Sequence, residues 1–333
     1  MLTNVLFIEK QRKRAQMSGD KKHTWKNLAL ADFARIFNTS TKELPTECKL
    51  IINSHDFRYR YLEGKERDAA ILQAIQPIVS GSLSKVGKER QPIWHTGWKE
   101  NLQAFEKNKF DLNSLYPKYF HSGRAFRIEG QYAVAKTEPF EINFGKVFKT
   151  WLFKKYFSKV ESIYEFGCGS GINIAILAQL FPDKPIHGLD WVSPSKKIVD
   201  HFSKHFDWKT EGHIFNMFKP NKKFKLDPNS GVLLFSVLEQ MGNNYHDFLS
   251  YLISQKPKIV VHVDSMEELY NPKNLLDYIA VSYGKNRNYL SEYLTNLKEL
   301  ARRKRVQILQ TTYVNFGNLF LDGYSFDIWR SKD

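Results

Sequence analysis

The sequence is poor in cysteine and has no long apolar run. Its two cysteines, Cys48 and Cys168, exclude a scaffold held by disulfides and cannot by themselves hold a zinc ion. No apolar stretch approaches the roughly 20 residues of a membrane span. The first residues lack a basic segment ahead of their short apolar run and show no cleavage-site pattern. We therefore expect a cytoplasmic protein without a membrane span.

Negative charge is also scarce, and the resulting positive excess is uneven. The chain carries 50 Lys and Arg against 35 Asp and Glu, for a formal net charge of +15. Residues 1–158 hold 28 basic and 16 acidic side chains, whereas residues 159–333 hold 22 and 19. Most of the excess therefore lies in the N-terminal half, where it favours an anionic partner. Part of it is ordinary solvated surface charge.

The length of 333 residues allows about two domains, and the pattern of elements changes near residue 140. Residues 1–140 predict a mainly helical, basic cap or substrate region. Its apolar residues recur at helical spacing over 25–37, 67–79 and 93–108, the last with Trp94, Trp98, Leu102 and Phe105 on one face. Residues 49–61 are ambiguous, and alternation near 126–128 and 132–134 is typical of strands.

Residues 141–333 alternate between short apolar strands and helices. After a helix over 141–156, this pattern predicts strands at 160–166, 185–190, 211–215, 231–236 and 258–264, with helices at 172–181, 194–206 and 245–254 between them. Two further helices, 272–283 and 289–304, precede a closing strand pair, 306–313 and 319–329, joined by a short glycine-containing turn. Such a pattern indicates an α/β fold with a doubly wound, Rossmann-like parallel sheet and a terminal antiparallel pair.

The first strand of this region runs into a turn with glycine at every second position. The stretch Glu165-Phe166-Gly167-Cys168-Gly169-Ser170-Gly171 precedes a helix, and the next strand ends in Asp190. Glycines let the backbone turn sharply and approach a ligand, and the helix N-terminus offers free N–H groups. A carboxylate at the end of the second strand can accept both hydroxyls of a ribose.

This constellation resembles class I S-adenosylmethionine-dependent methyltransferases, whose pattern is an acidic residue, a glycine loop and a second acid. A nicotinamide or flavin enzyme is the alternative, but the third glycine comes one residue too early for the dinucleotide fingerprint. The resemblance implies S-adenosylmethionine as cofactor. It implies that the cofactor contacts Glu165, Gly167, Cys168, Gly169, Gly171, Asp190, Trp191, Asn216, Met217, Ser236 and Val237. For Cys168, Trp191 and Asn216 the alternatives are a small residue that fits the loop, a core aromatic and a turn-forming asparagine.

The ends of the fourth and fifth strands supply the candidates for catalysis. Glu239 resembles the acid found at this position in small-molecule O-methyltransferases. His262 and Asp264 alternate onto one strand face, so they form a polar pair at the end of an apolar strand. We expect Glu239 or His262 to act as general base toward a hydroxyl, with Asp264 beside them. His262 could instead be a satisfied core histidine. Glu239 and Asp264 could also contribute to a divalent-metal site, but no third ligand is evident, so metal dependence stays open.

Beyond the core, several stretches are similar to bacterial sugar O-methyltransferases of surface-polysaccharide gene clusters. They are 66–72, 94–102, 164–169 and 317–324. The similarity implies an anionic sugar or glycan acceptor, which we expect the cap to select through His121, Arg124 and Arg127. An RNA methyltransferase is the main alternative, supported by the net charge and by Arg302-Arg303-Lys304-Arg305. A non-catalytic binding module is another. The oligomeric state stays open.

Overall fold

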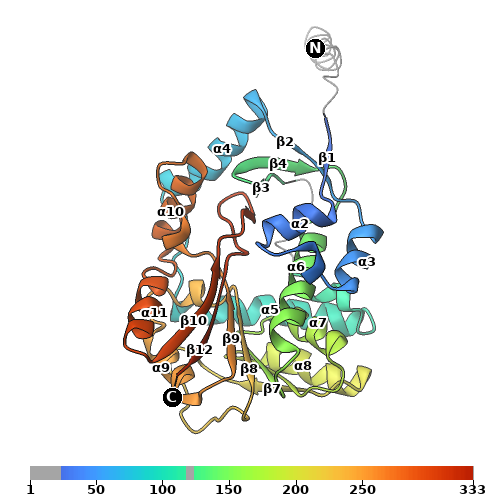
Figure 1. The fold of residues 1–333 in the computed structure, drawn as a ribbon, viewed down its shortest axis with the longest axis vertical. Helices are drawn as coiled ribbons and strands as arrows, with labels where there is room; N and C mark the ends of the chain where they lie inside the picture. The colour runs from blue at the N-terminus through green and yellow to red at the C-terminus, as the bar shows by residue number, and fades with distance from the viewer. Residues whose placement is uncertain (1–23, 118–123, 333) are drawn as a thin grey trace, which may run out of the picture.

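The central feature of the fold is a seven-stranded sheet. The computed structural model describes residues 24–117 and 124–332. The strand order is β7-β6-β5-β8-β9-β12-β10. Pairs from β7 to β9 are parallel, whereas β12 is antiparallel to β9 and β10. The strands are β5 Ile163–Phe166, β6 Ile186–Asp190, β7 Thr210–Ile214, β8 Gly231–Phe235, β9 Ile259–Val263, β10 Val306–Thr312 and β12 Phe326–Ser331. This confirms the expected α/β, doubly wound, Rossmann-like sheet with its closing antiparallel pair (Figure 1).

Helices cover both faces of this sheet, because successive strand residues point to opposite faces and both sets are apolar. Ile163 and Ile186 pack with α6, α7 and α8 in one core, and Tyr164 and Leu189 pack with α9 and α11 in the other. The helices of this region are α6 Phe140–Phe157, α7 Ile172–Leu180, α8 Ser193–Phe206, α9 His246–Gln255, α10 Leu275–Arg287 and α11 Tyr293–Arg302. Within the described ranges, no helix combines the length and apolar character that crossing a membrane requires.

The N-terminal region is mainly helical and also carries a small antiparallel sheet. Its helices are α2 Leu30–Ile36, α3 Thr46–Ser54, α4 Gly64–Val79 and α5 Gln91–Lys107, and its strands are β1 Lys26–Asn27, β2 Arg58–Tyr61, β3 Phe126–Ile128 and β4 Gln131–Ala135. The ambiguous stretch 49–61 thus holds the end of α3 and all of β2. The small sheet has the order β1-β2-β4-β3-β11, in which β11 is Phe316–Gly317. The strand-like alternation near residues 126–134 is confirmed as β3 and β4.

The connection between the last two long strands is not the short turn that we expected. β10 ends at Thr312 and β12 begins only at Phe326. Between them, Phe316–Gly317 form β11, which pairs with β3 of the N-terminal sheet. In Figure 1 this connection extends from β10 and β12 toward β3. A Cβ on Gly317 would lie 2.0 Å from the Leu321 carbonyl oxygen, so only glycine fits there. The C-terminal part of the chain therefore completes the N-terminal sheet.

Arg127 is a structural residue at this junction and not part of an acceptor site. Its side chain is fully buried, and it forms ion pairs with Asp277 at 3.2 Å and Asp322 at 3.0 Å. Its guanidinium also donates to the Phe320 carbonyl. Two carboxylates inside the protein thus neutralise the Arg127 guanidinium. This corrects our expectation that Arg127 helps to bind an anionic acceptor. Arg124 is exposed, and His121 lies outside the described residues.

Candidate active site

A cleft opens at the carboxyl ends of β5, β6, β7 and β8. Six residues that we assigned to the cofactor line it, namely Gly167, Asp190, Trp191, Met217, Ser236 and Val237. Six others line it that we had not assigned, namely Trp94, Trp98, Phe215, Phe218, Gln240 and Met241. The cleft lies where ligands bind in open α/β sheets.

The glycine loop needs its glycines for two separate reasons. Gly167 and Gly169 have φ values of 72° and 52°, in the left-handed region that side chains disfavour. A Cβ on Gly167 would come within 2.2 Å of Val237, and one on Gly169 within 2.8 Å of Trp98. Neighbouring side chains from the turn after β8 and from α5 therefore lie directly against the loop. The loop backbone forms the floor of the cleft.

Asp190 ends β6 with its carboxylate anchored to that loop. Oδ2 accepts the Gly169 N–H at 2.9 Å, and Oδ1 accepts the Val192 N–H at 3.2 Å. Burial raises the pKa of Asp190 to about 6, against the lowering effect of these backbone donors. Each carboxylate oxygen can accept a further hydrogen bond. The group is thus fixed in the cleft wall with acceptor capacity left for a ligand hydroxyl.

Aromatic side chains form two stacked pairs around the cleft. Trp191 stacks on Phe218 with ring centres 5.3 Å apart, and Trp94 stacks on Trp98 at 5.5 Å. We expected Trp94 and Trp98 to belong to the apolar face of a helix, together with Leu102 and Phe105. Only part of that face is core. Leu102 and Phe105 are buried, whereas Trp94 and Trp98 are partly buried and line the cleft. Two flat aromatic surfaces suit a planar heterocycle.

Glu165 lies behind the glycine loop and carries a buried oxygen without a partner. Its Oε1 accepts the Asn173 amide at 2.7 Å, but Oε2 has no hydrogen-bond partner among the described residues. Burial raises the Glu165 pKa to about 8, opposed by Asn173 and by the charge of Lys149. The pKa of Lys149 on α6 is in turn lowered to about 8 by burial. A buried acceptor without a donor fits a ligand cation such as an ammonium group.

Cys168 and Asn216 direct their side chains elsewhere. The Cys168 thiol is buried near Gly188 of β6, and burial raises its pKa well above the ordinary value, so it is an inert packing group. Asn216 is exposed, and its side-chain oxygen accepts the Phe218 N–H at 2.9 Å, which closes a turn. Neither side chain lines the cleft. Any contact between Cys168 and a cofactor would be through its backbone.

Glu239 and Asp264 are linked at the ends of β8 and β9. Glu239 lies in the 3-10 helix Leu238–Met241, and its backbone N–H donates to Asp264 Oδ2 at 3.0 Å. Its carboxylate accepts the amide of Gln240, a cleft residue. Burial, and then the charge of Asp264, raises the Glu239 pKa well above its usual range. A carboxylate held in this way is a strong proton acceptor when ionised.

His262 is fully buried, with both ring nitrogens facing carboxylates. Nδ1 lies 2.7 Å from Asp327 Oδ1, its cross-strand neighbour on β12, and Nε2 lies 3.3 Å from Asp264 Oδ2. The Tyr293 hydroxyl donates to the other oxygen of Asp327. Although burial lowers the His262 pKa, the two acids outweigh it and raise the value to about 9. The ring is therefore a charged link between two carboxylates, with no free nitrogen for an acceptor in this arrangement.

Two arginines that the sequence analysis did not single out converge beside the cleft. Arg90 precedes α5 and lies 5.5 Å from the Trp94 ring centre, and Arg287 ends α10 and lies 5.2 Å from that of Tyr289. Their segments are joined by the Val86 N–H, which donates to the Arg287 carbonyl. Arg90 Nη1 donates to the Ser84 hydroxyl at 2.7 Å, but neither guanidinium has an ion-pair partner within residues 24–117 and 124–332, and the buried Nε of each lacks a hydrogen-bond partner. Burial, and then the charge of Arg287, lowers the Arg90 pKa. Such a pair has unused capacity for an anion.

Comparison with known proteins gives structural likeness only. No family model and no curated relative matches this chain. Among solved structures, the S-adenosylmethionine-dependent methyltransferase SibL is 12% identical, with 92% of this chain and 89% of that chain covered and a TM-score of 0.42. The [4+2]-cyclase SpnF is 9% identical, over 75% and 97% of the two chains, at 0.46. The O-methyltransferase NcsB1 from neocarzinostatin biosynthesis is 11% identical, over 58% of each chain, at 0.38. Likeness at this level does not define an activity.

Proposed function

We propose that this protein is an S-adenosylmethionine-dependent methyltransferase that methylates an oxygen atom of a small anionic acceptor. The observation that carries the proposal is the combination, at one sheet edge, of the glycine loop, Asp190 in the cleft wall and the unpartnered buried oxygen of Glu165. This set provides a ribose-binding carboxylate, a close approach for a ligand and an acceptor for an ammonium group.

Each part of the cofactor has a matching group in the chain. Asp190 would accept the ribose hydroxyls. Trp191, Met217 and Phe218 would pack on the adenine, and Glu165 would accept the amino group of the methionine portion. When bound, S-adenosylmethionine supplies a methyl group activated by its sulfonium. The residues of this chain would then align the acceptor oxygen with that methyl and sulfur, an arrangement worth up to about 7–11 kcal/mol in well-oriented systems.

The acceptor side of the proposal rests on Arg90 and Arg287. Two guanidiniums beside a cleft, neither with an ion-pair partner among the described residues, suit a phosphate or carboxylate, which they can bind through charge-assisted hydrogen bonds. Glu239 would remove the hydroxyl proton as the oxygen attacks, a contribution of typically ~10²–10⁴-fold. A sugar hydroxyl on a nucleotide-linked, lipid-linked or glycan sugar meets these requirements, in line with the resemblance to sugar O-methyltransferases.

The proposal is tested first by cofactor binding. Wild-type protein should bind S-adenosylmethionine in a calorimetric titration, and Asp190→Ala should weaken binding at least tenfold, because a charge-assisted hydrogen bond contributes about 1.5–3 kcal/mol. Asp183→Ala, an exposed site away from the cleft, is the matched control. A folded Asp190→Ala protein with unchanged affinity would remove the cofactor assignment.

A transfer screen then identifies the acceptor. Methyl-labelled S-adenosylmethionine should pass label to nucleotide sugars or glycans, with Asp190→Ala as the inactive control. Label in RNA alone would favour the RNA methyltransferase. Binding of cofactor without transfer to any acceptor class would favour the non-catalytic module.

A further inference from the structure

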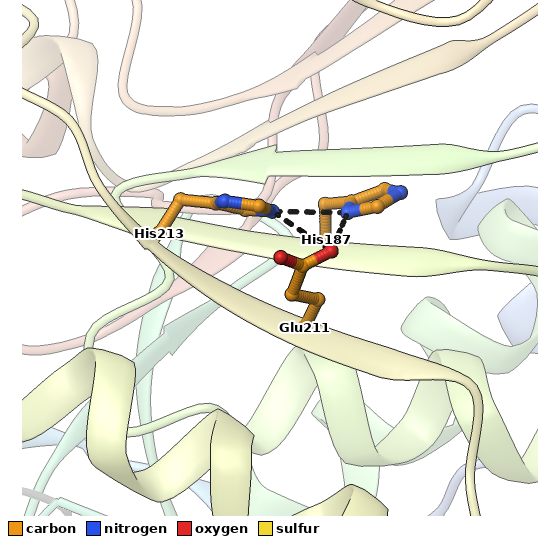
Figure 2. A group of neighbouring side chains, drawn as sticks. All are labelled: His187, Glu211 and His213. Carbon is orange, nitrogen blue, oxygen red and sulfur yellow. Dashed lines mark hydrogen bonds and ion pairs between the residues drawn. The ribbon is translucent and has the colours of Figure 1, made fainter.

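Two histidines and a glutamate meet on one face of the seven-stranded sheet, at the β6–β7 pair. In the parallel register His187 pairs with Glu211, and His213 follows Glu211 by two residues, so all three side chains point to the same face. Figure 2 shows the ring nitrogens of His187 and His213 directed toward each other, with the Glu211 carboxylate beside them. None of the three lines the cleft.

The distances between their ligand atoms match the coordination shell of a small metal ion. His187 Nδ1 lies 3.0 Å from His213 Nε2, and Glu211 Oε2 lies 3.7 Å from each nitrogen. A triangle with sides of 3.0, 3.7 and 3.7 Å has a circumradius of about 2.0 Å. One point is therefore about 2.0 Å from all three atoms, and zinc binds histidine nitrogen and carboxylate oxygen at about 2.0–2.2 Å.

The surroundings keep the histidines suited to bind a cation. Burial lowers the pKa of both rings, so both are neutral near pH 7 and each can offer a lone pair. His187 is held in place by stacking on Tyr164, with ring centres 4.4 Å apart. Its other nitrogen lies 3.9 Å from Asp227 Oδ2, close enough for a small side-chain movement to form the supporting carboxylate contact usual for metal-bound histidine.

The opposite face of the same two strands is tightly packed. Gly188 and Gly212 alternate with the three ligands along the strands and therefore face α8. A Cβ on Gly188 would lie 2.7 Å from Val199, and a Cβ on Gly212 would lie 2.5 Å from the Lys196 carbonyl oxygen. Helix α8 therefore fixes the backbone of both strands. The three ligand atoms are held by a rigid platform, which reduces the cost of ordering them around an ion.

We propose that His187, Glu211 and His213 bind one divalent transition-metal ion of the zinc class, separate from the methyl-transfer site. Two nitrogens and one carboxylate oxygen form a set preferred by zinc, and a fourth position remains for water. The ion links the edge strand β7 to β6 through side chains of both strands. Without the ion, one of the two facing nitrogens carries an N–H that donates to the other over 3.0 Å; when the ion binds, that proton moves to the outer nitrogen of the same ring, so both rings stay neutral.

The test uses the untagged full-length protein, stripped with chelator and titrated with Zn²⁺ by calorimetry. We expect one ion per chain with submicromolar affinity, and a visible d–d absorption band when Co²⁺ replaces Zn²⁺. Glu211→Gln and His213→Gln should each weaken binding on the order of 100-fold. Glu211 is exposed, so its variant should fold normally even if His213→Gln loses stability.

The matched control is the double variant His201→Gln/His205→Gln. These two histidines lie one turn apart on α8, a spacing that can bind metal adventitiously. The control should retain the wild-type affinity for Zn²⁺. Binding that survives Glu211→Gln and His213→Gln, binding lost in the α8 control, or no submicromolar binding at all would each overturn the proposal. Because none of these readouts uses S-adenosylmethionine, failure here leaves the proposed function untouched.

Discussion

The carboxylate of Asp264 accepts the backbone N–H of Glu239 at 3.0 Å, and so joins the end of β9 to the turn after β8. The same carboxylate accepts the Ser265 N–H and faces His262. Asp264 therefore positions the Glu239 backbone. Both carboxylate oxygens of Asp264 already have a partner within the protein. Of the three residues expected to act in catalysis, Glu239 is the one whose carboxylate contacts a cleft residue, Gln240.

The first prediction concerns Glu239 as general base. Glu239→Gln keeps the size and hydrogen-bonding capacity of the side chain but cannot take a proton, so kcat should fall by about 10²-fold or more, with cofactor affinity within a few-fold of wild type. Steady-state kinetics and a calorimetric titration measure the two quantities. Rescue of the variant by Mn²⁺ or Mg²⁺ would instead indicate that Glu239 binds a metal. A fully active variant would contradict both roles.

The second prediction concerns His262 and the pH dependence of stability. Its folded-state pKa of about 9 exceeds the unfolded value of about 6.5. The stability that it contributes is then fully present below pH 6.5 and is lost as pH rises through 9. Wild-type unfolding free energy should decrease over this window relative to His262→Gln, by up to about 3 kcal/mol. Denaturant unfolding at several pH values measures it. Parallel pH profiles for the two proteins would show that His262 is not the charged link described here.

The third prediction concerns proton release when the cofactor binds. With a pKa of about 8, Glu165 is mostly protonated at pH 7 in the free protein. An ammonium group next to its free oxygen favours the ionised form, so binding should release a proton. Calorimetry in two buffers of different ionisation enthalpy counts the protons. Glu165→Gln should bind more weakly and release fewer protons, and an unchanged proton count would separate Glu165 from the cofactor site.

The fourth prediction compares two arginines three residues apart. Arg127→Ala would leave the buried carboxylates of Asp277 and Asp322 without their cation, so it should reduce the unfolding free energy by about 3–5 kcal/mol. Arg124→Ala, at an exposed position, should change it by less than about 0.5 kcal/mol. Thermal or denaturant unfolding provides the comparison. A stable Arg127→Ala protein with weakened acceptor binding would restore the role that we first expected for this residue.

The fifth prediction concerns the acceptor. Arg287→Ala should raise KM for an anionic acceptor at least tenfold with unchanged cofactor affinity, whereas Arg302→Ala, an exposed arginine on α11, should have no effect. Salt distinguishes a small acceptor from RNA, since each single-strand phosphate contact contributes a log–log slope of about −0.7. A slope steeper than about −3, with inhibition by total RNA, would exclude the sugar acceptor.

The core sheet could be predicted from the sequence because the patterns that indicate it are local. Glycine spacing, a strand-ending acid at Asp190 and apolar periodicity are each visible within one strand or helix, and six of the residues that they assigned to the cofactor line one cleft. By contrast, the role of His262 depends on Asp327, its partner across two strands that are distant in the sequence. From the sequence, both the core and the catalytic interpretation of this histidine stay open, since both place a polar residue on an apolar strand.

The remaining cleft residues depended on tertiary packing. Trp94 and Trp98 continue the apolar face of α5, so periodicity assigns them to the core, and only the position of α5 across the glycine loop brings them to the cleft. Arg90 and Arg287 are far apart in the sequence, and neither belongs to a recognisable motif. A pair of tryptophans one turn apart, ahead of a glycine-loop domain, was the one signal that could have indicated a ligand-facing helix.

The pairing of β11 with β3 also sets an order of events during synthesis. Roughly 190 residues separate the paired positions Ile128 and Phe316, which the ribosome needs on the order of 10–40 s to add. Throughout that interval β3 is an open edge strand and Arg127 lacks Asp322, and until residue 277 is added it lacks Asp277 as well. A nascent chain that stalls before residue 277 therefore presents an unpaired strand and an uncompensated charge, both of which favour capture by chaperones over productive folding.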